Sequence, residues 1–237
     1  MEMIIFCTPM SEYNKIIFKI NSFINPKCIL TDVGSTKETS MEHIRTKLKN
    51  KNSWISSHPI AGSEVSGPEH GSSKLFFGKW CILIKDKNTK KKNLNFLIKF
   101  WKRMGSKVSI MNSKKHDEIF SMTSHLPHLI AYNLVKTAIE FEKSKKYNLI
   151  KFSAGGLRDF SRIAASNEIM WRDIFFSNRR NLSKSIDLFI KNLKSFKKNI
   201  ELKNNKLILN KLIETKKVRK KIIQLKQDIN KPDFGRN

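Results

Sequence analysis

The chain has 237 residues, 39% of them hydrophobic, which is enough to fill the core of one large domain or two modest ones. Its formal net charge of +27 comes mostly from lysine spread over nearly every segment, and because no groove-reading motif accompanies this charge, we expect no nucleic-acid partner. Three cysteines without metal or redox spacing, and no apolar run near the roughly 20 residues that cross a bilayer, predict a soluble cytoplasmic protein with no membrane partner.

The first half of the chain alternates short strand patterns with helical patterns. Strands are predicted at residues 3–7, 27–31, 54–57, 81–85 and 107–111, with helices at 11–23, 37–49 and 93–104. This alternation predicts βα units around a largely parallel sheet. Residues 57–78 break the rhythm with four glycines, two prolines and two histidines, a composition typical of functional loops.

From about residue 113 the pattern is helical only. Helices are predicted at residues 116–145, with Pro127 kinking the helix or ending its first section, and at 159–165, 168–177, 181–202 and 206–229. The last two carry apolar residues at the three-four spacing of a buried face. The lysines of residues 216–221 could form a basic patch, but we prefer to interpret them as a solvated helix face.

His58 is the first candidate for chemistry. It follows a predicted strand and precedes Pro59, which holds its backbone extended at the carboxyl edge of the sheet, where open α/β folds bind ligands. An imidazole there can take up a proton near neutral pH. A structural histidine is the competing interpretation, but the glycines, hydroxyls and acid of residues 60–67 favour function.

Two further segments have alternative interpretations. Residues 32–37, Asp-Val-Gly-Ser-Thr-Lys, end a predicted strand and could hold a phosphate, orient a neighbouring side chain or simply cap a helix. His125 and His128 lie about one helical turn apart, but no third ligand has useful spacing. We therefore expect substrate contact or helix capping there, and no metal.

The densest chemistry lies in residues 152–176. This run combines a Gly-Gly pair and Trp171 with Arg158, Arg162 and Arg172. Guanidinium groups bind carboxylates through two parallel hydrogen bonds. With His58 upstream, the run indicates an enzyme that acts on a small organic acid.

Four of these segments together resemble the prephenate/arogenate dehydrogenase family of tyrosine biosynthesis: residues 32–37, 58–62, 123–128 and 155–175 match in order and spacing. The resemblance covers nearly all of the chain. It implies a Rossmann-type sheet followed by a helical dimerisation domain, a homodimer, and oxidative decarboxylation of prephenate or arogenate with NAD or NADP. A different hydride-transfer enzyme on the same kind of sheet would leave residues 155–175 unexplained.

The resemblance also implies roles for individual residues. His58 resembles the catalytic histidine that binds the ring hydroxyl, and Ser35 resembles the serine that supports that hydroxyl and the histidine. Arg162 resembles the arginine that binds a substrate carboxylate. The remaining implied positions line the substrate pocket or its entrance, namely His128, Gly155, Glu64 and Trp171, or touch the dinucleotide, namely Thr8, Pro9 and Ser35.

One departure from the family concerns the cofactor. The chain has no G-x-G-x-x-G turn, and Met1 stands where the family's fourth sheet strand begins, so roughly 60 residues of two βα units are expected to be missing. We therefore expect an N-terminally shortened enzyme without an anchor for the cofactor phosphates, in which residues 1–112 are the C-terminal half of a dinucleotide-binding domain and residues 113–237 a helical substrate and dimerisation domain. The alternative is a non-catalytic helical dimer, or binding module, that has lost its cofactor-binding half.

Overall fold

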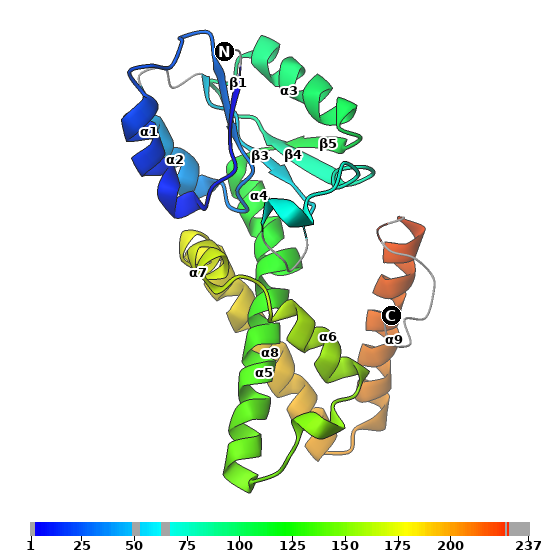
Figure 1. The fold of residues 1–237 in the computed structure, drawn as a ribbon. Helices are drawn as coiled ribbons and strands as arrows, with labels where there is room; N and C mark the ends of the chain where they lie inside the picture. The colour runs from blue at the N-terminus through cyan, green and yellow to red at the C-terminus, as the bar shows by residue number, and fades with distance from the viewer. Residues whose placement is uncertain (1–2, 49–52, 63–66, 226, 228–237) are drawn as a thin grey trace.

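The computed structural model describes residues 3–48, 53–62, 67–225 and 227, in which the strands precede a helical part (Figure 1). Strand β1 (Met3–Phe6) pairs in parallel with β2 (Ile29–Asp32). A parallel bridge between Leu30 and Trp54 continues this sheet toward a second one, whose order is β3 (Ser57–Pro59), β4 (Trp80–Ile84) and β5 (Lys107–Met111). The sheet of the predicted α/β part is therefore present.

The expectation of a largely parallel sheet is wrong at one pair of strands. Strand β4 runs parallel to β5 but antiparallel to β3, with His58 opposite Ile82. Helix α3 (Lys91–Arg103) supplies the crossover that a parallel β4–β5 connection needs. Between β3 and β4 the described residues contain only a 3₁₀ turn (Pro68–His70), so the chain reverses direction instead of crossing over.

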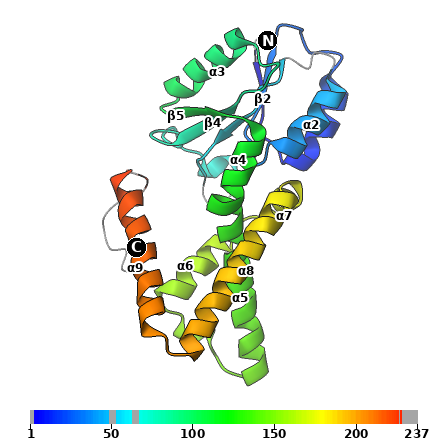
Figure 2. The same ribbon diagram turned by 180° about the vertical axis from the view of Figure 1, so that it is seen from behind.

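Helices cover both faces of the sheet (Figures 1 and 2). Helices α1 (Tyr13–Ile20) and α2 (Glu38–Lys47) enclose one core with the first two strands, and α3 packs on the opposite side against β4. Leu94, Leu97 and Trp101 follow the three-four spacing of a buried stripe, which explains how α3 is held on the sheet.

The predicted long helix at 116–145 is divided into three parts. Helix α4 (Ser113–Phe120) leads into a π-helical turn (Ser121–His125), and α5 (Leu126–Lys145) follows. The break lies just before Pro127. A proline ring has no amide hydrogen and clashes with the preceding turn, so the wider turn accommodates it without ending the helical run.

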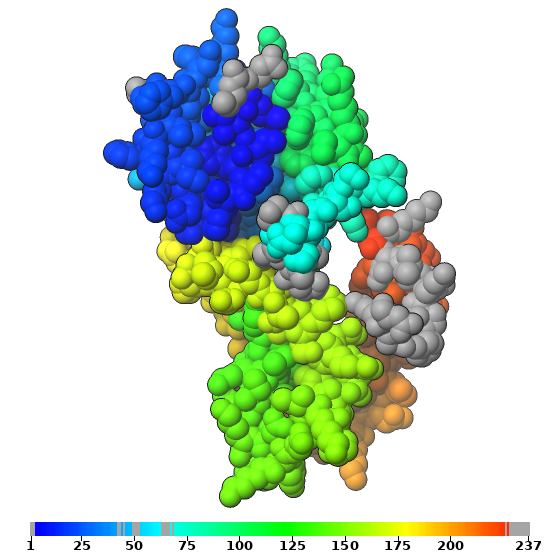
Figure 3. All heavy atoms as spheres, viewed as in Figure 1, coloured from blue at the N-terminus to red at the C-terminus, as the bar shows by residue number. Residues whose placement is uncertain are grey.

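The remaining helices form the lower half of the molecule in Figure 1. They are α6 (Gly155–Ile163), α7 (Glu168–Ser177), α8 (Arg179–Glu201) and α9 (Asn205–Gln224). Helix α7 packs against the N-terminal part, while α9 extends away from the end of α8 (Figure 3). Among the described residues, no helix is both long and apolar enough to cross a membrane.

Candidate active site

The ends of β1 and β2 and helix α7 enclose a cavity of about 420 Å³. Thr8, Pro9 and Ser35, the three residues assigned to the dinucleotide from sequence, all line this cavity. A Cβ atom on Gly34 would lie 2.9 Å from the Met10 side chain and 3.0 Å from Asp32 Oδ2, so a larger residue in the turn beside Ser35 would require these side chains to shift. The helical side of the cavity is formed by Asn167, Met170, Asp173 and Ile174.

His58 lies within strand β3 rather than in a loop beyond it, which corrects its predicted place. Its residue surface is 8% exposed, and its ring packs against Phe120 with centroids 4.8 Å apart. Burial, reinforced by His116, Lys37 and His125, holds the pKa of His58 well below its ordinary value. The imidazole is therefore neutral at physiological pH and able to accept a proton.

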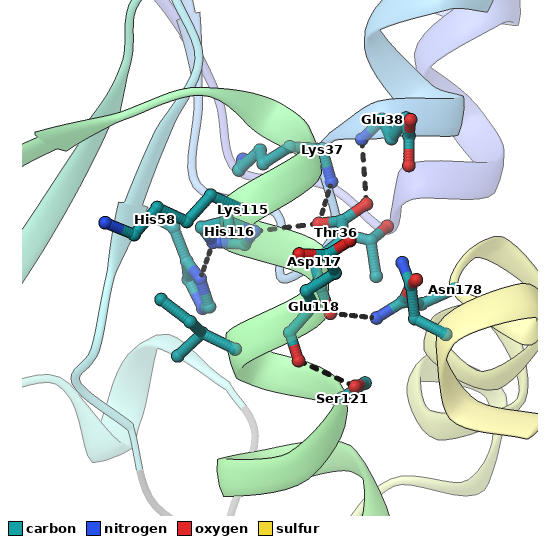
Figure 4. Close-up of polar contacts among 12 residues, drawn as sticks. Thr36, Lys37, Glu38, His58, Lys115, His116, Asp117, Glu118, Ser121 and Asn178 are labelled. Atoms are coloured by element: carbon teal, nitrogen blue, oxygen red, sulfur yellow. Dashed lines mark hydrogen bonds and ion pairs between the residues drawn. The ribbon is translucent and has the colours of Figure 1, made fainter. Parts of the chain in front are cut away.

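His58 begins a chain of buried polar contacts that ends on a carboxylate (Figure 4). His58 Nδ1 lies 2.8 Å from His116 Nε2, and His116 Nδ1 lies 2.8 Å from Asp117 Oδ1. Asp117 accepts the backbone N–H groups of Lys37 and Glu38, each at 2.9 Å. These amides open α2, so Asp117 on α4 caps a helix that lies 79 residues earlier in the sequence.

The segment 32–37 connects three elements through buried hydrogen bonds. Of the roles that its sequence left open, namely phosphate binding, orientation of a neighbouring side chain and helix capping, the last is not observed, because the N-cap residue Lys37 makes no side-chain capping bond. Lys37 is fully buried, and its Nζ donates to Asp32 Oδ2 at 2.6 Å and to the Ser57 carbonyl at 2.7 Å. Asp32 Oδ2 also accepts the Gly34 amide at 3.0 Å. These bonds fix the end of β2, the start of α2 and the start of β3 relative to one another.

His125 and His128 lie close in sequence but bind different partners. The His128 ring stacks on Trp171 with centroids 3.7 Å apart, and its Nδ1 lies 2.9 Å from the Ser124 carbonyl. His125 is fully buried, and its Nδ1 accepts the Asn178 side-chain amide at 3.0 Å. Burial lowers the pKa of His125 to about 4. No group of three or more metal-ligating side chains occurs in the part of the chain that the structure describes.

Two buried ring nitrogens beside this region, His125 Nε2 and Trp171 Nε1, have no well-aligned hydrogen-bond partner among the described residues. Because His125 Nδ1 accepts a hydrogen bond, the neutral ring carries its proton on Nε2, so both nitrogens are donors. The His125 ring also interacts with the backbone of Ser35, which leaves Trp171 Nε1 as the clearer unpaired donor. Leaving a buried donor unpaired costs about 1–3 kcal/mol, which is typical of a site that a ligand or water completes.

The other predicted site residues are less closely grouped. Arg162 is exposed in the last turn of α6, and Gly155 opens the same helix with free space around it. Helix α6 lies beneath the 3₁₀ turn Pro68–His70 of the connection between β3 and β4 (Figures 1 and 3). Arg172 on α7 forms an ion pair with its neighbour Asp173 at 2.7 Å, whereas Arg158 and Arg162 lie on α6. Glu64 lies outside the described residues.

Sequence reasoning missed His116, Asp117 and Asn178. The Asn178 side-chain amide donates to the Asp117 carbonyl at 2.8 Å as well as to His125. The available signal was the adjacent His-Asp pair just after the last strand, but its partners lie far away in sequence. Only the folded chain brings them together.

Comparisons with known proteins match the two parts of the chain separately. The sequence model described as "Prephenate dehydrogenase, nucleotide-binding domain" matches residues 1–110, and "Prephenate dehydrogenase, dimerization domain" matches residues 112–226. The expectation that the first part retains only half of a nucleotide-binding domain finds no support in this match.

Individual relatives cover most of the chain. The cyclohexadienyl dehydrogenase of Zymomonas mobilis is 30% identical over 92% of this chain and 74% of its own length. The prephenate dehydrogenase of Bacillus subtilis is 31% identical over 84% of this chain and 53% of its own length. The crystal structure of prephenate dehydrogenase from A. aeolicus in complex with hydroxyphenyl propionate and NAD+ superposes with a TM-score of 0.88 at 34% identity. It covers 93% of this chain, which in turn covers 76% of that structure. The N-terminal Rossmann-like part, the helical part that follows it and these matches together show that the chain belongs to the prephenate dehydrogenase family.

Proposed function

We propose that this protein catalyses the NAD- or NADP-dependent oxidative decarboxylation of prephenate or arogenate in tyrosine biosynthesis. The observation that carries the proposal is His58, a buried neutral base in a member of this family. The names of the relatives support the same chemistry, because a cyclohexadienyl dehydrogenase and a prephenate dehydrogenase both match most of the chain.

The cavity at the strand ends fits the nicotinamide end of a dinucleotide. Its volume of about 420 Å³ lies in the range of small-molecule sites, and the relative from A. aeolicus was crystallised with NAD+. Thr8, Pro9 and Ser35 would hold the cofactor beside the Gly34 turn. A nicotinamide held there would supply the hydride acceptor for oxidation at the carbinol carbon of the substrate.

The chain's own residues would supply proton transfer and orientation. His58 takes the proton of the ring hydroxyl, because its lowered pKa keeps the imidazole unprotonated before the reaction. Ser35 supports that hydroxyl. Arg162 binds a carboxylate of the substrate through its planar fork. By the family resemblance, His128, Trp171 and Gly155 would line the substrate pocket or its entrance, and the same role for Glu64 stays a prediction outside the described residues. Loss of carbon dioxide then makes the ring aromatic, which drives the reaction.

The domain organisation follows the same proposal. Residues 1–112 would form the dinucleotide-binding domain, and residues 113–237 the helical substrate and dimerisation domain of a homodimer. Exposed apolar side chains on α8 and α9, including Leu193, Leu209, Leu212 and Val218, support the dimer because a partner subunit would remove them from water.

A substrate and cofactor matrix tests the proposal. The purified chain is incubated with prephenate or arogenate and with NAD+ or NADP+, and reduced nicotinamide and aromatic product are measured together. We expect equimolar formation of both in at least one combination. No turnover in all four combinations, from folded protein, would contradict the proposed activity.

A further inference from the structure

We propose that His116 and Asp117 are positioning residues that fix the tautomer of His58, leaving Nε2 as the nitrogen that receives the substrate proton. The inference rests on the proposed role of His58 as the base, and it adds which atom acts and what holds it. It follows from the direction of each hydrogen bond in the chain of contacts from Asp117 to His58.

The carboxylate of Asp117 accepts the hydrogen bond that it shares with His116. The backbone amide of Lys37 donates to Oδ1 and that of Glu38 donates to Oδ2, so both oxygens are acceptors. The carboxyl group, which is only 1% exposed, therefore has no hydrogen to give to His116. The 2.8 Å contact between Asp117 Oδ1 and His116 Nδ1 must use the hydrogen of His116.

The direction of the bond between His116 and Asp117 decides which nitrogen of His58 carries a hydrogen. His116 is fully buried, and burial lowers its pKa, so its ring is neutral with one hydrogen, on Nδ1, and a lone pair on Nε2. That lone pair lies 2.8 Å from His58 Nδ1. Two facing lone pairs would repel at this distance, so His58 Nδ1 carries the hydrogen and donates it. The neutral His58 ring then has its own lone pair on Nε2.

The surroundings shield these two rings from most contact with solvent. The ring of Phe120 lies 4.8 Å from the His58 ring and 4.4 Å from the His116 ring, between centroids. The groups that shift the pKa of His58 beside burial are Lys37 from the start of α2, His116 from α4 and His125 from the π-helical turn, and the Cys81 thiol of β4 contacts the His58 backbone. Lys37 is held by Asp32 and the Ser57 carbonyl, and Asp117 stands behind His116.

The consequence for catalysis is electrostatic. When the substrate hydroxyl gives its proton to His58 Nε2, the positive imidazolium strengthens the hydrogen bond from Nδ1 to His116, and the negative carboxylate lies at the far end. One proton moves in this step, and no proton is transferred between His58, His116 and Asp117. The hydrogen bonds from His58 to His116 and from His116 to Asp117 therefore offset part of the cost of placing a charge on a base that burial keeps neutral.

The same carboxylate ties the base to the cavity. Asp117 caps α2 at Lys37 and Glu38, only two residues after Ser35. The segment that carries the supporting serine and the strand that carries His58 are thus fixed to one anchor (Figure 4). Their relative position is set before a ligand enters.

Nitrogen-15 NMR of the whole protein at neutral pH tests the tautomer directly. We expect His58 to show a protonated, pyrrole-type Nδ1 and an unprotonated, pyridine-type Nε2. A wild-type spectrum with the hydrogen on Nε2 would overturn the proposal without any variant. If His58 shows the predicted tautomer but the protein has no dehydrogenase activity, the positioning role of His116 and Asp117 is supported and only the proposed function is contradicted.

A pair of variants tests the role of the acceptor. His116→Gln keeps an oxygen that can accept from His58 Nδ1, whereas His116→Leu has similar bulk and no acceptor. We expect His116→Leu to give mixed His58 tautomers and to lower kcat on the order of 100-fold with little change in KM. His116→Gln should retain the wild-type tautomer and recover most of the turnover.

The pair also separates positioning from support of the fold. A role in structure alone would lower thermal stability in both variants and leave the His58 tautomer in the folded fraction unchanged. Equal kcat values for His116→Leu and His116→Gln, or a wild-type tautomer in His116→Leu, would contradict the inference.

Discussion

At the scale of single residues, the site combines buried neutral histidines with a buried carboxylate. His58, His116 and His125 all have a lowered pKa, and burial is the largest cause in each case. The candidate role of His58 could be predicted because Pro59 and the following glycines mark a functional loop. Its partners could not, because nothing local in the sequence shows that Asp117 meets the amides of Lys37 and Glu38.

The role of Arg162 can be tested by removing its guanidinium. Arg162→Ala should raise KM for prephenate or arogenate roughly 10- to 100-fold, because a bidentate, charged hydrogen-bond pair is lost. Arg162→Lys keeps the charge without the planar guanidinium, so its KM should lie between those of the wild type and Arg162→Ala. Steady-state kinetics measure the effect, and an unchanged KM in Arg162→Ala would remove Arg162 from the substrate site.

The buried histidines should make stability depend on pH. His125 has a pKa near 4 in the folded protein and an ordinary value near 6.5 unfolded, so its neutral form contributes stability that is complete above pH 6.5 and is lost progressively as the pH falls from about 6.5 to about 4. Between pH 7 and pH 4 this amounts to roughly 3 kcal/mol.

The measurement is urea unfolding across this pH range, with His125→Gln as the comparison. The variant removes the titrating group, so its free energy of unfolding should fall less steeply with acidity than that of the wild type. Parallel curves for the two proteins would show that His125 is not buried in its neutral form.

At the scale of secondary-structure elements, the sequence predicts best where periodicity is continuous. Strand β5 and helix α7 have the predicted bounds. The expectation of parallel pairing was wrong for β3 and β4, because strand patterns carry no information on the direction of pairing, which depends on the connection between the strands. The π-helical turn before Pro127 was also missed, since a proline signals a break but not its geometry.

The tie between β2, α2 and β3 gives a prediction at this scale. Lys37→Met would leave the buried Asp32 carboxylate without its ion-pair partner and should lower the free energy of unfolding by roughly 3–5 kcal/mol. Adding Asp32→Leu removes the unpaired charge and should restore part of the loss. Chemical denaturation of the single and double variants measures this, and a loss below about 1 kcal/mol in Lys37→Met would contradict a structural role for the pair.

At the scale of the whole molecule, α4 joins the α/β part to the helical part, and α7 returns to contact the strand ends. Thr36 and Thr39 of the α2 segment donate to Ser177 at the end of α7, at 2.8 and 3.0 Å. The two parts therefore share one polar core around Asp117. The family resemblance predicted both parts from sequence, but their contact depends on long-range bonds that composition and periodicity do not encode.

Helix α9 gives a prediction for assembly. Its side chains Leu212 and Val218 are 52% and 56% exposed in the single chain. Leu212→Glu with Val218→Glu should shift a homodimer toward monomer in light scattering, because charge would enter an apolar interface. Asn210→Glu with Thr215→Glu adds the same charge at exposed polar positions and should leave the dimer intact. The same mass for all three proteins would exclude α9 from the interface.

The most direct test of the central claim is the turnover of wild-type protein and His58→Asn with prephenate or arogenate and a nicotinamide cofactor. Asparagine can still form hydrogen bonds but cannot take up the hydroxyl proton. We predict that kcat falls on the order of 10²- to 10⁴-fold while KM and thermal stability stay close to wild type. An active wild-type protein whose turnover is unchanged by His58→Asn would contradict the account, because the base would then lie elsewhere.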